Sequence, residues 1–260
     1  MIAVPIPVSY DDLPTKELRA PAGNRATGIL KLVAFVFMCI DHSGKMLFGN
    51  MYEMRLLGRI AFPLYIWCMI VGFSRTRSVP RYLLRVLAVG LVSQPFYVLA
   101  LNHTWTQPNI FLTMFLGLCV LWGLREKKWY SHLWAPVVGI LLAGLLNADY
   151  GWRGIMLFML LYAVRDSRPG IAAVMISFLL FWGTFYGTTS SLFGITLNWT
   201  LPPEWIATPL RSFARLETYG LLSLPFILIR FRKDVRLATW LGYALYPAHL
   251  IVLWLIEMIK

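Results

Sequence analysis

The stretch ILKLVAFVFMCIDHSGKMLF, at positions 29–48, is twenty residues long and mostly apolar. A helix of about 20 apolar residues is long enough to cross the hydrocarbon core of a bilayer. The same stretch contains Lys31, Asp41 and His42, and a charged side chain within a transmembrane helix costs about 2.5 to 3.5 kcal/mol on insertion scales. We therefore expect a membrane-spanning helix whose polar side chains have partners or a function.

Eight further apolar stretches follow the first along the chain. They lie at about 56–73, 82–101, 109–124, 133–147, 152–164, 170–188, 212–229 and 236–257. The sequence of 260 residues is 58% hydrophobic and 14% charged, whereas about a quarter of the residues in a soluble domain are charged. This composition excludes a soluble globular enzyme, a disordered chain and a disulfide-stapled domain. It predicts an all-α, polytopic integral membrane bundle of about nine transmembrane helices.

Two of the stretches, 133–147 and 152–164, are shorter than the roughly 17 residues that a full span requires. We expect them either to recruit neighbouring residues or to form a shallow hairpin around residues 147–151. The first 28 residues place Pro and charged residues between short apolar pieces and lack the apolar core of a cleavable signal peptide. We therefore expect a cytoplasmic N-terminal tail over 1–28 and a transmembrane domain over 29–260.

Basic residues alternate from one connection to the next. The second, fourth, sixth and eighth connections contain Arg75, Arg77, Arg81, Arg85, Arg125, Lys127, Lys128, Arg165, Arg168, Arg230, Arg232, Lys233 and Arg236. The intervening connections contain only Arg55, Arg153 and Arg211. Because Lys and Arg collect in cytoplasmic loops, this alternation predicts a cytoplasmic N-terminus and a C-terminus on the opposite side. We attribute the net charge of +12 to this topology and expect no nucleic-acid partner.

Polar side chains gather at one depth, toward the outer ends of the predicted helices. They are Asp41, His42, Lys45, Arg59, Gln94, Asn109, Asp149, Arg153, Arg211, Arg215, Glu217 and His249. At 1.5 Å per residue, Gln94 lies about 18 Å and His249 about 20 Å along helices that run outward. Ionisable groups inside a membrane face the bundle interior or a water-filled space, so the shared depth predicts a cavity. Lys31 lies near the inner end of the first helix, about 16 Å from His42 along the axis and on nearly the same face.

His42, beside Asp41, is a candidate general base, because imidazole titrates near neutrality and a neighbouring carboxylate holds its tautomer. The plainer interpretation is an interfacial polar pair, in which Asp41 also lies four residues from Lys45. Arg59 fits a structural ion pair and the binding of a substrate carbonyl or phosphate equally well. His249 follows a proline, where a kink frees backbone groups for hydrogen bonding, and it is a further candidate for the site.

Other polar residues have stronger structural alternatives. Asp149 lies in an ADYG turn, where Asp commonly bonds to the local backbone, although it also lies at the depth of the cavity. Gln94 and Asn109 more often form hydrogen bonds between helices than take part in chemistry. His103 and His132 lie in connections, and we expect them to be solvated. The sequence has no P-loop, dinucleotide-binding Gly motif, Ser nucleophile elbow or metal-ligand spacing, so we expect no metal site and none of those chemistries.

Six segments occur in order from about residue 28 to the end: GILKLVAFVFMCIDHSGKMLF, LLGRIAFPLYIW, VSQPFYVLA, NIFLTMFLGL, NADYGWRGI and YALYPAHLIVLWLI. In combination they resemble the TraX family, membrane proteins of conjugative plasmids that acetylate the N-terminus of pilin. That family in turn resembles a superfamily of transmembrane acyltransferases, in which a basic residue precedes a first-helix His with ten residues between them. Lys31 and His42 match this spacing, with Lys where Arg is usual.

The resemblance implies a pilin-maturation enzyme of a conjugative, type IV secretion system in the bacterial inner membrane, with a periplasmic C-terminus. It further implies acetyl-coenzyme A as the acyl donor, and the pilin subunit and membrane lipids as partners. Two alternatives stay open at this point. The chain could join the two ends of a pilin into a ring, or it could be a transporter, a lipid flippase or a non-enzymatic pilin chaperone.

Residue roles follow from this interpretation. Asp41 orients His42, His42 is the base, and Arg59 and His249 stabilise the acyl carbonyl. Six further residues are expected to contact substrate: Lys31, Lys45, Gln94, Asn109, Asp149 and Glu217.

Overall fold

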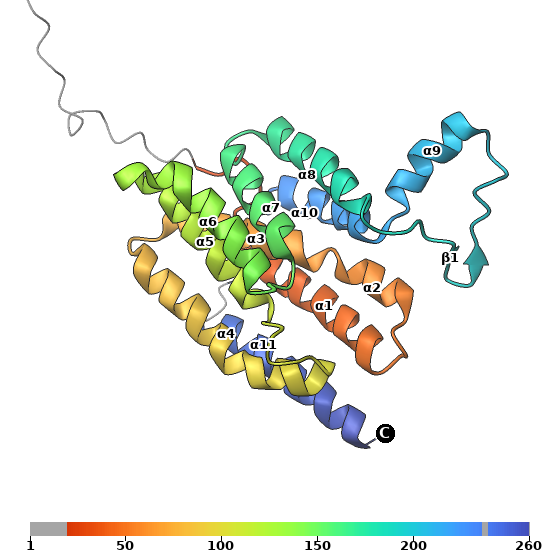
Figure 1. Cartoon of the computed structure of the whole chain (residues 1–260), viewed down its shortest axis with the longest axis horizontal. Helices are drawn as coiled ribbons and strands as arrows, with labels where there is room; N and C mark the ends of the chain where they lie inside the picture. Colours follow the sequence, from red (N-terminus) through yellow and green to blue (C-terminus); the bar gives the residue numbers. More distant parts are fainter. Residues whose placement is uncertain (1–19, 236–238, 260) are drawn as a thin grey trace, which may run out of the picture.

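The structure, a computed structural model, describes residues 20–235 and 239–259, and the regular secondary structure there is helical apart from one short β-hairpin (Figure 1). Its α-helices are α1 (Thr27–Met46), α2 (Tyr52–Gly58), α3 (Ala61–Arg75), α4 (Val79–Leu101), α5 (Ile110–Glu126), α6 (Ser131–Leu145), α7 (Gly151–Ala163), α8 (Arg168–Gly183), α9 (Glu204–Phe213), α10 (Leu224–Leu228) and α11 (Thr239–Ile259). The described residues also include two 3₁₀-helices, η2 (Lys128–Tyr130) and η3 (Leu216–Ser223), and two antiparallel strands, β1 (Ser191–Leu192) and β2 (Ile195–Thr196). The all-α prediction is confirmed for this part of the chain.

Each predicted apolar stretch falls on helical structure, as far as its residues are described, but the helices differ in length. Four helical segments in the described part are long and apolar enough to cross a membrane: Thr27–Met46, Tyr52–Arg75, Val79–Leu101 and Leu241–Ile259. The second of these joins α2 and α3, whereas α7, α8 and η3 with α10 are apolar but shorter. These are the helices of a multi-pass membrane protein, while nine spans and the orientation of the ends stay predictions.

The prediction of one helix over 212–229 is wrong in detail. α9 ends at Phe213, η3 occupies the middle of the stretch, and α10 is only five residues long. The break lies at Arg215, whose extended backbone (φ −116°, ψ 148°) forms an isolated β-bridge with Thr188. A residue that pairs as a strand cannot continue a helix, so a long-range backbone contact overrides the apolar pattern here.

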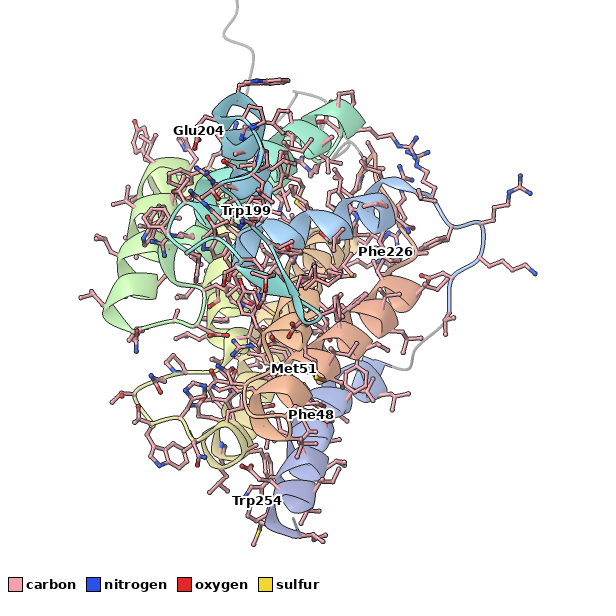
Figure 2. All side chains as sticks on the ribbon, turned by 90° about the vertical axis from the view of Figure 1, so that its right-hand side faces the viewer. Phe48, Met51, Trp199, Glu204, Phe226 and Trp254 are labelled. Carbon is pink, nitrogen blue, oxygen red and sulfur yellow. The ribbon has the colours of Figure 1, made fainter. Side chains whose placement is uncertain are left out.

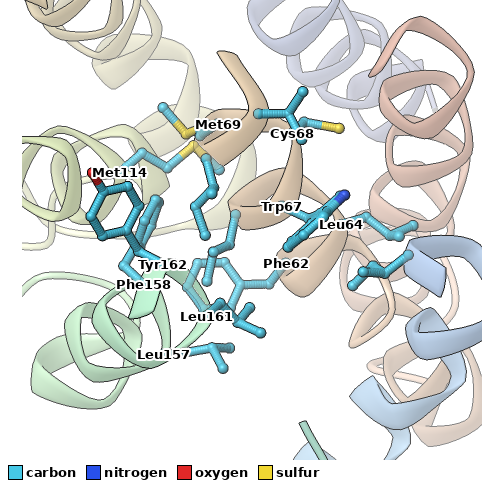
Figure 3. Close-up of a cluster of buried hydrophobic side chains, with 14 of the residues drawn as sticks. Phe62, Leu64, Trp67, Cys68, Met69, Met114, Leu157, Phe158, Leu161 and Tyr162 are labelled. Atoms are coloured by element: carbon cyan, nitrogen blue, oxygen red, sulfur yellow. The ribbon is translucent and has the colours of Figure 1, made fainter. Parts of the chain in front are cut away.

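The core of the bundle is built around α3. Leu64 and Trp67 of this helix are completely buried, and Phe62 is nearly so. Figure 3 shows these side chains packed with Phe158 and Leu161 of α7. A helix that is apolar on all sides requires such all-round cover. The surrounding helices therefore fix α3, and with it the short connection from α2 that carries the candidate site arginine.

Residues 20–26 also pack against the bundle. Asn24 is completely buried, and its Nδ2 donates to the Phe226 carbonyl oxygen at 3.1 Å. The indole Nε1 of Trp67 donates to the Asn24 carbonyl oxygen at 2.7 Å, so the peptide group and the side chain of Asn24 are both bound. This part of the predicted tail therefore belongs to the folded bundle, and residues 1–19 lie outside the described residues.

The helices α4 and α11 lie side by side along one edge of the bundle (Figure 1). Tyr97 of α4 and both Tyr246 and Leu250 of α11 form a buried cluster with Met38 of α1. The last helix therefore packs against the first, although they are far apart in sequence. This arrangement brings the polar residue of the YPAHL segment to the polar end of α1.

The segment between α8 and η3 projects from the bundle and contains the β-hairpin and α9 (Figure 1). Figure 2 shows this side of the molecule, with Trp199 and Glu204 labelled on the projecting segment. The hairpin is attached to α2, because the backbone N–H of Phe193 donates to Glu53 Oε1 at 2.9 Å. The projection is thus held next to the same short helix that leads into the candidate site.

Candidate functional site

A cavity of about 550 Å³ lies inside the bundle and is lined mainly by residues of α1, α3, α4, α5 and α11 and of the turn before α7. Its charged and imidazole lining consists of Lys31, Asp41, His42, Lys45, Arg55, Arg59, His103, Asp149, Arg153 and Glu217. Seven tyrosines line it as well: Tyr65, Tyr82, Tyr97, Tyr150, Tyr186, Tyr243 and Tyr246. Along α1 the lining extends from Lys31 to Lys45, about 21 Å at 1.5 Å per residue. Seven of the ten expected site residues thus line one space, whereas Gln94, Asn109 and His249 are not part of its lining.

The imidazoles of His42 and His249 are in direct contact between α1 and α11. His42 Nδ1 and His249 Nε2 are 2.8 Å apart. His249 Nδ1 lies 3.2 Å from the carbonyl oxygen of Leu245, one turn earlier in α11. The rings of Phe35 and Tyr246 pack edge-on against His249. The candidate base is therefore held by a second imidazole, which is itself enclosed by aromatic rings.

These two contacts fix the tautomers of the pair. A carbonyl oxygen only accepts hydrogen bonds, so neutral His249 carries its proton on Nδ1 and presents a lone pair at Nε2. His42 then donates from Nδ1 to His249, which leaves the lone pair of His42 on Nε2. Because His42 lines the cavity, this nitrogen is the candidate proton acceptor.

Asp41 lies at the centre of a buried ion network. Arg55 Nε donates to Asp41 Oδ1 at 2.8 Å, and Arg59 Nη2 donates to the same oxygen at 3.1 Å. Arg59 Nη1 also donates to Glu217 Oε1 at 3.1 Å. The side chains of Asp41, Arg59 and Glu217 are only 12%, 10% and 6% exposed. Of the two interpretations of Arg59, the geometry supports the structural ion pair, since two carboxylates bind this guanidinium.

The structure corrects two expectations about Asp41. In the part of the chain that the structure describes, Asp41 forms no hydrogen bond with His42 and no ion pair with Lys45, because its carboxylate binds the two arginines instead. Neighbouring residues of a helix point about 100° apart, so Asp41 faces α2 while His42 faces α11. Gly58 makes this possible, because a Cβ there would overlap the Asp41 side chain. The close approach of α2 therefore depends on glycine.

Lys45 is bound to His103, and the expectation that His103 is solvated is wrong. Lys45 Nζ and His103 Nε2 are 2.7 Å apart, and His103 Nδ1 donates to Gln107 Oε1 at 2.9 Å. The His103 ring also stacks on Tyr97, with centroids 4.7 Å apart. Burial lowers the pKa of His103 below its usual value, which favours a neutral ring that accepts from the ammonium group. The loop after α4 is thus fastened to the end of α1.

Gln94 and Asn109 bind each other outside the cavity lining. Asn109 donates to Gln94 Oε1 from its backbone N at 2.8 Å and from Nδ2 at 2.9 Å. Gln94 Nε2 donates to the Gln107 carbonyl oxygen at 2.9 Å. Asn109 Oδ1 caps α5 by accepting from the backbone N–H of Phe111 at 3.0 Å. The geometry supports a structural role for Gln94 and Asn109. Their hydrogen bonds join α4 to α5 and shape the loop that carries His103.

Asp149 lies in the turn between α6 and α7 and faces the cavity. Asn147 and Gly151, at the two ends of the turn, have left-handed backbone conformations with φ of 50° and 52°. Tyr150 anchors the turn by stacking on Phe62, with ring centroids 3.7 Å apart. Desolvation by the surrounding protein raises the pKa of Asp149 to about 6, although the residue is exposed and lines the cavity. Among the described residues no hydrogen bond or ion pair occupies its carboxyl group.

Arg55, His103, Arg153 and the seven tyrosines are the polar lining residues that the sequence analysis did not assign to the site. Arg55 lies four residues before Arg59 and hence on the same helix face, a signal that predicts a shared partner. Six of the tyrosines occur in apolar stretches, where an aromatic residue more often marks a core position, and Tyr150 lies in the ADYG turn. Tyr150 shows their contribution, since the Arg59 guanidinium carbon lies 6.0 Å from its ring centroid.

The fold and the cavity define an integral membrane protein with an internal ionisable site whose geometry suits proton transfer. Comparison with known proteins gives the family. The family model described as TraX protein matches residues 26–257, and the chain therefore belongs to the TraX family.

Three relatives are similar to parts of the chain. The probable fimbrial assembly protein FimC, serogroup H1, of Dichelobacter nodosus is 36% identical over 72 residues, which are 26% of this chain and 30% of that protein. The uncharacterized protein RP591 of Rickettsia prowazekii (strain Madrid E) is 30% identical over 99 residues, 38% of each protein. Protein TraX of Escherichia coli (strain K12) is 26% identical over 157 residues, 56% of this chain and 60% of that protein. The chain thus spans less than two thirds of the length of these relatives. No solved structure matches it.

Proposed function

We propose that this chain is a membrane acyltransferase that acetylates the N-terminal amine of a pilin subunit at the bacterial inner membrane. The observation that carries the proposal is the contact of His42, a residue that lines the cavity, with His249. We infer from this contact that the lone pair of His42 is on Nε2. Amide formation requires such a base, because the attacking amine must lose a proton as the new bond forms. Membership of the TraX family and a fimbrial assembly protein among the relatives support pilin as the acceptor.

Asp149 is the proposed anchor for the acceptor amine. An α-amine has a pKa of about 7.7 to 8.0, so it arrives mostly as an ammonium ion near neutral pH. The carboxylate of Asp149 attracts this ion into the cavity, where it loses one proton to water. The nitrogen then bonds to the acyl carbon while His42 Nε2 takes a second proton. The leaving group departs with the electron pair of its bond to that carbon and receives the proton from His42.

Lys45 is the proposed cation for the acyl oxygen, on which negative charge develops during the transfer. It lies three residues after His42 and therefore on the same side of α1, and both side chains line the cavity. His103 accepts one of the three N–H groups of its ammonium. Arg59 is held by two carboxylates, so the role first expected of it passes to Lys45.

Acetyl-coenzyme A is the proposed donor, and it would supply an acyl group activated as a thioester. The inner end of the cavity has cations that fit a phosphate-bearing donor. Lys31 lines this end, and the guanidinium carbon of Arg85 lies 5.8 Å from the ring centroid of Tyr82, another lining residue. Both cations suit phosphate oxygens, and they would hold the donor in the cavity that also contains His42.

Intact-mass spectrometry of pilin tests this proposal. Pilin from cells with the wild-type chain should be heavier by one acetyl group than pilin from cells without it. His42→Ala should abolish this increase while the protein stays in the membrane. His132→Ala is the matched control, because His132 lies in the first turn of α6 and is not a lining residue. Full acetylation by His42→Ala would refute the assignment.

The same masses distinguish the alternatives. Joining the two ends of pilin also makes an amide at the α-amine, but it gives a pilin lighter by one water. A transporter, a flippase or a non-enzymatic chaperone leaves the pilin mass unchanged, and pilus assembly would then not require His42.

A further inference from the structure

Arg153 is a cavity-lining guanidinium without a carboxylate partner. Within residues 20–235 and 239–259 no ion pair or hydrogen bond reaches its side chain, and its Nε is buried without an acceptor. Its guanidinium carbon instead lies 3.8 Å from the ring centroid of Phe185 and 4.9 Å from that of Trp152. The other two arginines of the lining, Arg55 and Arg59, are both bound to carboxylates. Arg153 is therefore available to a ligand, and the other two are not.

The position of Arg153 at the start of α7 makes its unpaired positive charge still less favourable. It lies in the first turn of α7, where the helix dipole favours anions and disfavours cations. This turn has no acidic residue, and no side chain caps it. A buried donor without an acceptor is unfavourable, so the guanidinium and the adjacent backbone N–H groups together favour an anionic ligand.

The surroundings of Arg153 indicate which anion fits. Trp152, Phe181 and Phe185 form an aromatic cluster next to the guanidinium. Phe181 and Phe185 are 45% and 51% exposed, at the end of the apolar helix α8. Exposed aromatic rings at the end of a membrane helix lie at the depth of lipid headgroups. A guanidinium stacked on a ring keeps its edge for two oxygens of a phosphate group.

We propose that Arg153 and the first turn of α7 bind the phosphate of a phospholipid whose acyl chains lie against Phe181 and Phe185. This site does not depend on acetyl transfer, because none of its residues belongs to the proposed chemistry. Since Arg153 also lines the cavity, the bound headgroup would lie next to the cavity.

Native mass spectrometry of the purified chain, titrated with phosphatidylglycerol, tests the site. Arg153→Gln should bind this lipid about tenfold or more weakly, as expected for the loss of hydrogen bonds to a charged group. Arg153→Lys keeps the charge but not the planar fork, so its affinity should lie between the two. Arg211→Gln is the matched control, because Arg211 pairs with Glu204 and is not a lining residue.

Two competitors identify the chemistry. Diacylglycerol has the acyl chains without the phosphate, and inorganic phosphate has the anion without the chains, so both should displace the lipid poorly. Equal lipid binding by Arg153→Gln and Arg211→Gln would overturn the proposal. Displacement by diacylglycerol as effective as that by phosphatidylglycerol would overturn phosphate recognition, and equally effective displacement by inorganic phosphate would overturn a lipid as its source.

Discussion

Breaking the ion pair of Arg59 and Glu217 should cost far more stability than breaking an exposed pair of the same length. Arg59 Nη1 and Glu217 Oε1 are 3.1 Å apart, and the two side chains are 10% and 6% exposed. Arg211 Nη2 and Glu204 Oε1 are 3.2 Å apart, and those side chains are 31% and 73% exposed. The two pairs have the same residue types and nearly the same length, and the exposed pair has a second contact, from Arg211 Nη1 to Glu204 Oε2 at 3.2 Å. A larger effect at the buried pair would therefore reflect burial and not the number of hydrogen bonds.

The expected loss of stability follows from the group that each substitution leaves without a partner. Arg59→Gln leaves Glu217 as a buried charge without its partner, and a loss of this kind costs about 3 to 5 kcal/mol. Asp41 keeps Arg55, so we expect a value near the lower end of that range. Arg211→Gln leaves a solvated carboxylate, and exposed pairs contribute about 0 to 1 kcal/mol.

Chemical unfolding in detergent micelles measures both effects. Each pair needs three variants, the two single Gln substitutions and the double, because the double-mutant cycle separates the pair from the other contacts of each side chain. The coupling energy of Arg59 with Glu217 should exceed that of Arg211 with Glu204 severalfold. Equal coupling energies for the two pairs would refute the reasoning, since burial would then have no effect on them.

Three further predictions concern single positions. His249→Ala should lower kcat for acetyl transfer with little change in the acceptor KM. The double variant of His42→Ala and His249→Ala should be no less active than His42→Ala alone, because the two imidazoles act as a unit. Additive losses of activity in steady-state kinetics would contradict this. Above pH 6, Asp149→Asn should raise the melting temperature, because desolvation disfavours the carboxylate of the native state. Below the ordinary pKa of 3.8 it should have no such effect, because the carboxyl group is then protonated in both the folded and the unfolded state. A difference in melting temperature that does not depend on pH would argue against this. Gly58→Ala should destabilise the fold by about 1 to 3 kcal/mol through overlap with a carboxylate of α1. Gly144→Ala, with open space around the new methyl group, should be neutral or slightly stabilising in the same unfolding assay, and equal losses at both positions would contradict the argument.

The helices and the depth of the site could be predicted from patterns within single segments. Lipid offers no partners for backbone polar groups, so long apolar stretches must form helices, and the described chain has helical structure in each of them. The two short stretches form α6 and α7, which meet at the turn that contains Asp149. Depth was informative because it depends only on the distance of a residue from the helix end, and most of the expected polar residues line one cavity.

The contacts between segments could not be predicted. His42 meets His249 across 207 positions of sequence, and Lys45 meets His103 across 58. The rotation of α11 about its axis decides the first contact, and the path of the loop after α4 decides the second; neither depends on local composition. Adjacency favoured Asp41 as the partner of His42, yet successive helix positions diverge by about 100°, so sequence neighbours on a helix do not face each other.

Acetyl transfer by the purified chain in nanodiscs tests the central claim most directly. The substrates are labelled acetyl-coenzyme A and a synthetic peptide with the free N-terminus of pilin. If His42 Nε2 deprotonates the acceptor amine, the wild type and His132→Ala should label the peptide, His42→Ala should not, and a peptide with a blocked amine should stay unlabelled. Labelling of the free peptide by His42→Ala at the wild-type rate would contradict the account.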